Sequence, residues 1–389
     1  MSPVFLLAWR YLTYYKVRSA MLAAALAAIA LLPLAVGLLV GRYNADLIAR
    51  ADATPLVAGA KGNRFDLIMA ALYFRKARVD PVPYAEAEAI LDSGLALPIP
   101  LHARFTAKGY PIVGTTPDYY DFRRLRLASG GLPALLGECA LGANVARDLG
   151  IAPGGTLLSD QQNLYDISAD YPLRMRVTGV FAETGTPDDD AVFADIKTAW
   201  VIEGIGHGHV DMASKAGAAD VMERREGEVV ASPALATAME ITPENLDSFH
   251  FHGDWSAFPL TAILCLPRDA KSATIIAGRY HVSKDYQMLV PRGVVDELVG
   301  IVLRLKRFLD ANLAVVAAAS AIFLGLIVWL TRQLRARERE TLHRMGCGRR
   351  TVFWMFAAEL AILAVAAAAL ASLAALAILW LAPGIREVR

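Results

Sequence analysis

Three long apolar runs stand out in the pattern of hydrophobic and polar positions along the 389-residue chain. They cover residues 19–40, 311–330 and 352–382, and Glu359 is the one charged side chain within them. A helix rises about 1.5 Å per residue, so about 20 apolar residues cross the roughly 30 Å hydrocarbon core of a bilayer. The pattern therefore predicts an α-helical membrane domain with three transmembrane helices, over residues 19–41, 311–331 and 352–382.

Residues 1–18 are predicted to form an amphipathic helix before the first span. Phe5, Trp9 and Leu12 share one helical face, and aromatic rings suit the membrane interface. The segment contains three basic residues and no acid, and residues 332–351 contain seven arginines. Because Lys and Arg concentrate in cytoplasmic loops, both segments are expected in the cytosol.

This orientation predicts a multi-pass protein of the bacterial inner membrane, with residues 42–310 and the tail 383–389 in the periplasm. The large insertion between the first two spans mixes strand-like and helix-like segments, which indicates an α+β domain, expected to have two lobes. We expect helices at 66–77 and 83–93, extended segments at 175–181, 191–204 and 259–267, a loop over 53–68, and a helix over 296–312 that leads into the second span.

Charge and cysteine content narrow the class of protein. A formal net charge of +1 argues against a general nucleic-acid binder, which carries a basic surplus. The three cysteines contain no CxxC pair, which excludes a disulfide scaffold and a thiolate zinc cluster. Two arrangements of Cys139 and Cys265 remain open: a single disulfide, or two isolated buried thiols.

The segment between the second and third spans is highly charged and longer than a simple turn requires. One helical face holds Leu334, Thr341, Leu342 and Met345, and arginines and glutamates occupy the rest. Gly346 and Gly348 then predict a helix cap and a turn before the next helix. This segment is interpreted either as a positively charged anchor or as a docking helix for a cytosolic protein. Two interpretations of Glu359 also remain open. It is either a carboxylate at the membrane interface or an ion-pair partner for the arginines that precede it.

The stretch RERETLHRMGCGRRTVFWMFAAEL, at residues 337–360, resembles the cytosolic loop of ABC permeases of the FtsX/MacB/LolC type. The Arg-rich lead-in before the first span and the large extracytoplasmic insertion also resemble this family. The residues that match its loop pattern are Arg339, Glu340, Arg344, Gly346, Arg349 and Glu359.

A second stretch, at residues 109–158, is similar to the periplasmic domain of MacB-like permeases. It contains GYPIVGTTPDYY and, further on, LGANVARDLGIAPGG. The residues in matching places are Gly142, Ala146, Leu149, Gly150 and Gly154. The family usually has four spans, whereas three apolar runs are present here.

The resemblance implies a homodimeric transmembrane subunit that works with two copies of a separate ABC ATPase. The segment 332–351 would be the coupling helix and turn that this ATPase grips, with Leu342 and Met345 filling a groove. Motion would pass from there to the periplasmic domain (mechanotransmission), to export, extract or release a substrate. A periplasmic adaptor or substrate protein is a further expected partner.

The chain contains no phosphate-binding loop of the type G-x-x-x-x-G-K-[ST]. The stretch GAKGNR, at residues 59–64, has the wrong spacing and is expected outside the membrane. ATP hydrolysis, with its ATP and Mg²⁺, is therefore expected on the partner, and the chain itself is predicted not to be an enzyme.

Four of the seven histidines form two HxH pairs, and each pair is followed two residues later by an aspartate. Residues i and i+2 of a strand point to the same face, so two such pairs could meet and offer zinc four ligands. The alternative is ordinary surface or hydrogen-bonded histidines. A catalytic metal would also need a base, for which Glu203 or Asp211 is available. The candidate ligands are His207, His209, Asp211, His250, His252 and Asp254.

The acidic stretch VFAETGTPDDDAVF, at residues 180–193, predicts a solvated acidic turn, with calcium binding as the alternative.

Three hypotheses for the function follow from the sequence. The first is the permease subunit of an ABC transporter, and the second is a membrane protein that binds zinc through the histidine pairs. The third is a membrane-anchored periplasmic enzyme whose charged loop serves only as an anchor.

Overall fold

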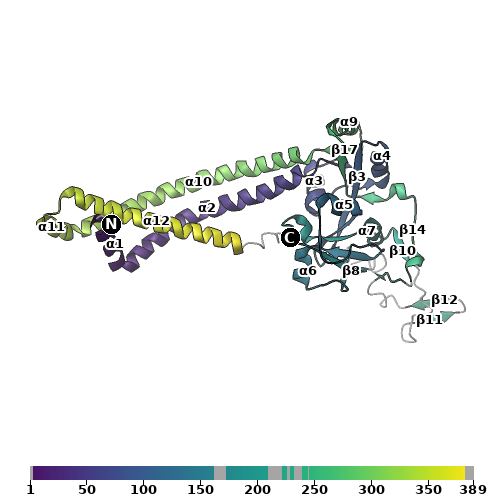
Figure 1. Ribbon diagram of the computed structural model, residues 1–389, viewed down its shortest axis with the longest axis horizontal. Helices are drawn as coiled ribbons and strands as arrows, with labels where there is room; N and C mark the ends of the chain where they lie inside the picture. Colours follow the sequence, from purple (N-terminus) through teal and green to yellow (C-terminus); the bar gives the residue numbers. More distant parts are fainter. Residues whose placement is uncertain are drawn as a thin grey trace. The chain divides into compact units, whose positions relative to one another are not determined.

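The computed structural model describes residues 3–161, 172–208, 221–225, 228–231, 239–243 and 245–381. The chain divides into two compact units. The membrane unit comprises Met1–Ala45 and Val299–Arg389, and the sheet domain comprises Asp46–Leu298. Figure 1 shows the long helices that dominate the first unit and the strands that make up the second.

Three helices of the described chain are long and apolar enough to cross a membrane. An α+β domain lies between the first and the second of them in the sequence, so the predicted architecture is confirmed. Two of these helices extend well beyond their apolar runs: α2 has 37 residues and α10 has 44. The helices of this part are α1 (Pro3–Tyr14), α2 (Lys16–Asp52), α10 (Pro291–Leu334), α11 (Ala336–Arg344) and α12 (Arg349–Leu381).

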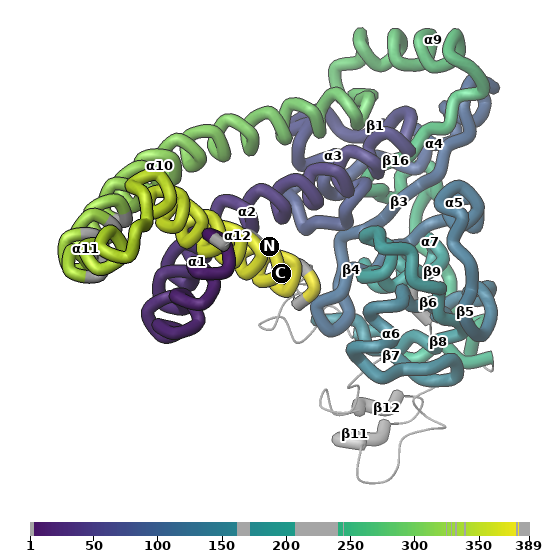
Figure 2. Tube along the Cα trace, turned by 60° about the vertical axis from the view of Figure 1, so that its left-hand side comes forward, coloured from purple at the N-terminus to yellow at the C-terminus, as the bar shows by residue number. Residues whose placement is uncertain are grey.

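Small residues hold α12 against its neighbours in the membrane unit. Ala27 of α2 packs with Ala367 and Ala371 of α12, where the absence of long side chains lets the two backbones approach closely. Nearby, Leu12 of α1 packs with Leu363 of α12, so that α1 lies beside α12 (Figure 2).

The sheet domain is built on one mixed sheet of 11 strands, in the order β13-β8-β6-β9-β4-β3-β16-β1-β17, with β5 and β7 also paired to β8. Its parallel pairs are β4 with β9, β6 with β8 and β13 with β8. The strands are β1 (Leu56–Ala60), β3 (Ala96–Ala107), β4 (Tyr110–Thr115), β5 (Leu127–Gly130), β6 (Glu138–Leu141), β7 (Thr156–Leu158), β8 (Leu173–Phe181), β9 (Val192–Asp195), β13 (Met239–Glu240), β16 (Ala262–Pro267) and β17 (Tyr286–Leu289).

Shorter elements complete the domain. Three two-stranded ribbons pair β2 (Val82–Pro83) with β15 (Pro259–Leu260), β10 (Gly206–Gly208) with β14 (Phe249–Phe251), and β11 (Val221–Arg225) with β12 (Glu228–Ala231). The helices are α3 (Arg64–Tyr73), α4 (Tyr84–Asp92), α5 (Pro117–Arg123), α6 (Ala143–Leu149), α7 (Ile196–Ile202) and α9 (Ala270–His281), with 3₁₀ turns η1 (Pro187–Asp190), η2 (Leu246–Ser248) and η3 (Trp255–Ala257).

Two hydrophobic clusters form the core of this domain. One gathers around β4, β6 and β8 and includes Cys139, and the other gathers around β1, β16 and α7 and includes Cys265. Both cysteines are free and buried, so the alternative of two isolated thiols is confirmed and the disulfide is excluded. Burial raises the pKa of each thiol to about 12.

Two secondary-structure predictions for this domain are wrong. Residues 191–204 were expected to be extended throughout, but β9 ends at Asp195 and α7 begins at Ile196. The Asp195 carboxylate accepts a hydrogen bond from the Lys197 N–H and thereby caps that helix. The loop expected over 53–68 instead forms β1 and α3. Because β1 pairs with β16 and β17 on its two sides and is mostly buried, it lacks the alternation that marks a half-exposed strand.

The other local predictions agree with the structure. The predicted helices at 66–77 and 83–93 correspond to α3 and α4, although α3 ends at Tyr73. The extended segments at 175–181 and 259–267 correspond to β8, β15 and β16, and the helix over 296–312 is part of α10.

Candidate functional site

The charged segment between α10 and α12 folds as the predicted short helix, α11. Two apolar side chains near its C-terminal end are accessible to a partner. Leu342 is only half-buried, and Met345, which directly follows the helix, is 67% exposed. Glu340 accepts a hydrogen bond at 2.6 Å from Arg344 one turn later, and both side chains are exposed. A shallow depression of about 490 Å³ on this helix is lined by Ala336, Glu340, His343 and Arg344.

The helix ends in the glycine turn that the sequence predicted. Gly346 has a φ of 91°, a left-handed conformation that favours glycine. Its N–H donates to the His343 carbonyl at 3.0 Å, and the Cys347 N–H donates to the Leu342 carbonyl at 3.0 Å. These two bonds form a Schellman motif. The Gly348 carbonyl then accepts hydrogen bonds from the Thr351 and Val352 N–H groups of α12, so a short hydrogen-bonded turn joins α11 and α12.

Arg335, between α10 and α11, links three helices of the membrane unit. Its Nη1 lies 3.1 Å from Oε2 of Glu359 in α12, and both side chains are buried. Its Cζ lies 3.6 Å from the centre of the Tyr11 ring in α1 and 4.7 Å from the Phe356 ring in α12. The interpretation of Glu359 as a partner for a loop arginine is therefore confirmed.

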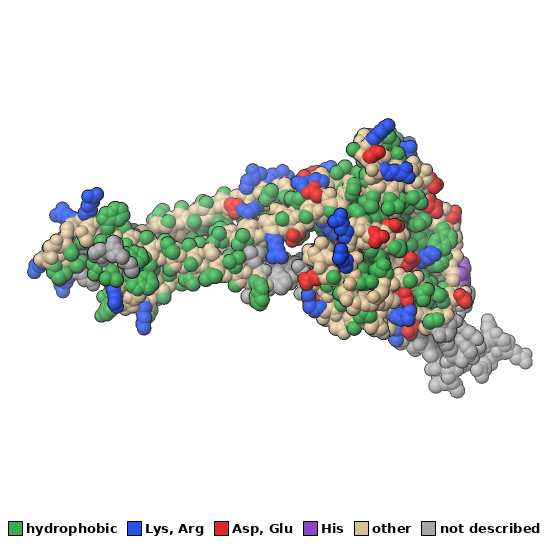
Figure 3. Space-filling view, viewed as in Figure 1, with side chains coloured by type: hydrophobic (Ala, Val, Ile, Leu, Met, Phe, Trp, Pro, Cys, Tyr) green, Lys and Arg blue, Asp and Glu red, His purple; other side chains and the backbone are tan. Residues whose placement is uncertain are grey.

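Sequence reasoning did not single out Arg335 or Tyr11. A carboxylate in an apolar run signals a buried partner, but seven arginines were available in the loop and spacing does not choose among them. Of the remaining predicted residues, Arg349 is exposed at the start of α12, and Arg339 belongs to α11 but its side chain lies outside the described part of the structure. Basic side chains are visible around the end of the membrane unit that holds α11 (Figure 3).

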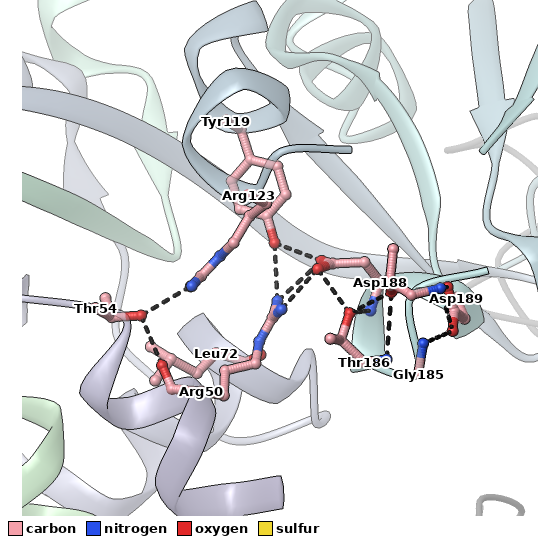
Figure 4. A network of polar contacts seen from close by, with 10 residues as sticks. Arg50, Thr54, Leu72, Tyr119, Arg123, Gly185, Thr186, Asp188 and Asp189 are labelled. Atoms are coloured by element: carbon pink, nitrogen blue, oxygen red, sulfur yellow. Dashed lines mark hydrogen bonds and ion pairs between the residues drawn. The ribbon is translucent and has the colours of Figure 1, made fainter. Parts of the chain in front are cut away.

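A second polar cluster lies inside the sheet domain, around Asp188 of η1 (Figure 4). The Arg50 guanidinium donates to both carboxylate oxygens of Asp188, at 2.6 and 2.9 Å. It also donates to the Leu72 carbonyl at 2.6 Å and to the Tyr119 hydroxyl at 2.9 Å. That hydroxyl in turn donates to Asp188 at 2.6 Å. Since Arg50 belongs to the last turn of α2, this network fastens the end of α2 within the sheet domain.

The burial of this network sets its ionisation. Burial alone would raise the pKa of Asp188, but the Arg50 charge and the hydrogen bonds from Arg50 and Tyr119 outweigh it, so the pKa is lowered. Burial is the main reason that the pKa of Tyr119 is raised. Asp188 is therefore a carboxylate at neutral pH, and Tyr119 is a neutral hydroxyl that can donate to it.

The prediction of a solvated acidic turn over 180–193 is wrong. Asp188 is 3% exposed and Asp189 is 1% exposed. The Asp189 carboxylate accepts hydrogen bonds from the Thr184 and Gly185 N–H groups, so it holds the turn itself together. Both carboxylates are bonded to donors of the protein, an arrangement that does not fit the calcium alternative.

The histidine pairs are brought together in part. Strands β10 and β14 are antiparallel, with His207 opposite His250. The His250 and His252 rings lie 4.6 Å apart between centroids, and Asp254 caps η3 by accepting from the Ser256 N–H. His209 and Asp211 lie outside the described residues. Within the described ranges, no group of three or more His, Cys, Asp or Glu side chains is placed to hold a metal ion.

The remaining candidate base, Glu203, lies at the end of α7. Its Oε1 accepts from Nη1 of Arg104 at 2.8 Å. Its Oε2 lies 3.0 Å from Nε2 of the fully buried His102, although the orientation of the two groups does not give a hydrogen bond. Glu203 is therefore paired with basic side chains of β3.

Residues 312–387 match the family model of the FtsX-like permease C-terminal domain. This part of the chain is similar to the C-terminal part of FtsX-like permeases. The matched region contains the end of α10, α11 with its glycine turn, and α12 with Glu359. The predicted resemblance to this permease family is therefore confirmed for the part of the chain that contains the charged segment 332–351.

Two solved structures are similar to part of this chain. One is the periplasmic region of MacB from Actinobacillus actinomycetemcomitans, at 11% identity and a TM-score of 0.36, covering 65% of this chain and 97% of that one. Another is the extracellular domain of the noncanonic ABC-type transporter YknZ from Gram-positive bacteria, at 10% identity and a TM-score of 0.33, covering 60% and 98%. The comparison with curated proteins gives no match.

The FtsX-like permease domain and the three candidate membrane helices support an assignment of the chain as an ABC transporter permease. Within the matched region, the candidate site consists of α11, its glycine turn and the Arg335–Glu359 pair.

Proposed function

We propose that this chain is the transmembrane subunit of an ABC transporter that transmits ATP-driven motion from a separate ATPase to its own sheet domain. It works as a homodimer with two ATPase subunits in the bacterial inner membrane. The N-terminus and α11 face the cytosol, where basic residues concentrate, and the sheet domain is periplasmic. ATP and Mg²⁺ bind to the ATPase, since the sequence has no phosphate-binding loop, and this chain is not itself an enzyme.

The observation that carries this proposal is the buried Arg335–Glu359 pair at the start of an exposed helix. Both ends of α11 are connected to α12. The Arg335–Glu359 ion pair connects the N-terminal end, and the Schellman turn connects the C-terminal end, so a partner that moves α11 would also move α12. The stacking of Arg335 on Tyr11 adds α1 to the same junction. Force applied to α11 would therefore reach the membrane helices instead of being absorbed by a flexible loop.

The route from the membrane helices to the sheet domain is provided by α2 and α10. Each continues as unbroken helix past its apolar run into residues of the sheet domain. Within that domain, the Arg50–Asp188 ion pair holds the last turn of α2. The Arg50 side chain is 5% exposed and the Asp188 side chain is 3% exposed. The outcome would be mechanical work on a periplasmic substrate (export, extraction or release), handled with a periplasmic adaptor or substrate protein.

The test is capture of a candidate partner ABC ATPase by this chain. The tagged full-length chain is co-expressed with that ATPase and purified in detergent, as wild type and as Leu342→Asp/Met345→Asp. The matched control is Val282→Asp/Val290→Asp, which places the same charges on exposed apolar residues of the sheet domain. Capture by wild type and control, with loss in the α11 variant, is expected. Capture by all three would remove α11 from the interface, and capture by none would favour a membrane-anchored periplasmic enzyme.

A second candidate function, compatible with the first, is zinc binding by the histidine pairs. It is favoured by the β10–β14 register, which sets His207 opposite His250, and by the adjacent His250 and His252 rings. Neutral imidazoles at these positions would supply the first ligands. Zinc content of the purified chain tests this: His250→Ala/His252→Ala should lose bound zinc, whereas His281→Ala, an exposed histidine on α9, should retain it. Equal zinc in all three proteins would reject the site.

A further inference from the structure

The exposed apolar side chains of α10 include a series that recurs at alternating spacings of four and three residues. Seven of them are between 47% and 70% exposed, and Asn312 and Ala319, also exposed, occupy the two remaining positions of the series. We call this series the α10 stripe. It comprises Ile301, Leu305, Phe308, Asn312, Val315, Ala319, Ile322, Leu326 and Trp329.

Large apolar residues next to the stripe, at Leu309, Val316, Phe323 and Leu330, are also 46–64% exposed, whereas another side of α10 is partly shielded. Leu313, Ser320 and Ile327 recur every seven residues and are partly shielded. At 3.6 residues per turn they lie about 140° around the helix from the stripe. The Lys306–Asp310 ion pair, at 2.6 Å, is also off the stripe. The stripe is thus an apolar face that the chain's own described helices leave uncovered.

Lipid cannot cover the whole stripe. Its first three members, Ile301, Leu305 and Phe308, precede the apolar run and alternate with Arg304, Lys306, Arg307 and Asp310. A stretch with this density of charge does not lie in the hydrocarbon core. Three large apolar side chains therefore face water in a single copy of the chain, and an exposed apolar patch of this kind marks an interaction site.

We propose that the α10 stripe is the seam of a parallel, in-register coiled coil between two copies of this chain. The inference rests on the proposed homodimer and names the surface that forms it. Alternation of four and three residues is the a/d pattern of a left-handed coiled coil, with Leu305, Asn312, Ala319 and Leu326 at a positions. Because every copy crosses the membrane in the same direction, the two α10 helices run parallel.

Asn312 fits the role of a register-setting residue. A single asparagine at an a position specifies alignment and dimerisation at some cost in stability. Its Nδ2 donates to the Phe308 carbonyl at 2.9 Å. An amide has a second N–H and an acceptor oxygen, which can pair with Asn312 of the second copy only when the two helices are in register.

The continuity of the stripe favours a second copy over other partners. It runs without interruption from the charged segment into the apolar run, so its occupant must itself pass from water into the bilayer. A soluble adaptor helix would cover only the first three members. The α10 helix of a second copy has the same polar and apolar segments at the same positions along its length, so it can cover the whole stripe.

Cysteine cross-linking in native membranes tests the seam. The full-length chain carrying Cys347→Ser is co-expressed with its ATPase, and single cysteines are introduced on α10 and oxidised. Cys139 and Cys265 are buried and do not interfere. We expect at least fivefold more covalent dimer from Leu305→Cys and Phe308→Cys than from Leu303→Cys. Leu303 is the matched control, because it is also an exposed leucine but lies on the side of α10 that faces away from the seam.

Equal dimer yields from these positions, or higher yields from Leu303→Cys, would overturn the seam. Cross-links of stripe cysteines only to another protein would do the same. The permease assignment is scored separately in the same preparations by capture of the ATPase. Capture without stripe cross-links rejects the seam and leaves the proposed function standing, whereas failure of both rejects both.

Discussion

Arg335 and Glu359 form an ion pair, with 3.1 Å between Nη1 and Oε2, at a place where the side chains are 8% and 9% exposed. They are 24 residues apart, and both lie within residues 312–387, the region that the permease family model matches. Glu340 and Arg344, on exposed α11, form the same kind of pair at 2.6 Å with 62% and 77% exposure. The two pairs therefore differ in their surroundings: one is buried at the junction of α10, α11 and α12, and the other lies on the exposed surface of α11, which the proposed function assigns to the ATPase contact.

Removing one half of the buried pair should be far more costly than removing half of the exposed pair. Glu359→Ala leaves the Arg335 charge buried without its carboxylate, which typically costs about 3–5 kcal/mol. Glu340→Ala removes a surface pair worth about 0.3–0.5 kcal/mol. Thermal unfolding of both variants in detergent measures the difference. Similar melting temperatures for the two variants would show that the Arg335 junction does not stabilise the protein.

Gly346→Ala should weaken coupling through the shape of the turn. The left-handed φ of 91° costs an alanine about 1–2 kcal/mol, so the Schellman motif would loosen. Gly348→Ala is the matched control, because Gly348 is not among the glycines with positive φ and an added Cβ there meets nothing within 4 Å. Stimulation of the partner ATPase by each variant is the readout. A loss confined to Gly346→Ala is expected, and an equal loss in both would contradict the role of the turn.

Asp188→Asn should destabilise the sheet domain in a pH-dependent way. It leaves Arg50 buried without its counter-charge, a loss of about 3–5 kcal/mol at neutral pH. Because the folded-state pKa of Asp188 is lowered, its contribution is complete above the unfolded-state pKa of about 3.9 and disappears as the pH falls through the folded-state value. The stability gap between wild type and variant should therefore be constant from about pH 8 to about pH 5 and shrink only below about pH 4.

Urea unfolding of the full-length chain in detergent across this pH range measures that gap. Asp296→Asn is the control, since Asp296 pairs with Arg292 at 2.7 Å on an exposed part of the chain. Its effect should be small at every pH. A gap for Asp188→Asn that already closes between about pH 6 and about pH 5 would mean that the carboxylate is not held by Arg50 as described.

Thiol labelling should distinguish the three cysteines. Cys139 and Cys265 are buried with raised pKa values of about 12, so they stay protonated and inaccessible at about pH 8. Cys347, in the glycine turn, is partly exposed. A maleimide should modify one site in the folded wild type, none in Cys347→Ser and the two buried sites only after unfolding. Rapid labelling of the folded Cys347→Ser variant would contradict the packing of the sheet domain.

The sequence by itself determined those features that depend on local pattern. Uninterrupted apolar length is enough to predict a membrane helix, and a glycine after an amphipathic helix is enough to predict the turn at Gly346. The spacing of apolar residues likewise predicted α11, α4 and β8. The family pattern in the loop was recognisable because it is confined to one short stretch of chain.

The tertiary structure decided what depends on residues far apart. Arg50 and Asp188 are 138 residues apart, and only the fold turns an acidic stretch that looked solvated into a buried counter-ion. Strand β1 owes its existence to pairing with β16 and β17, and Arg335 is distinguished from the other loop arginines only by Tyr11 and Glu359. Periodicity reports which side chains share a face of one element, whereas burial and charge pairing are set by the element that comes to lie against that face.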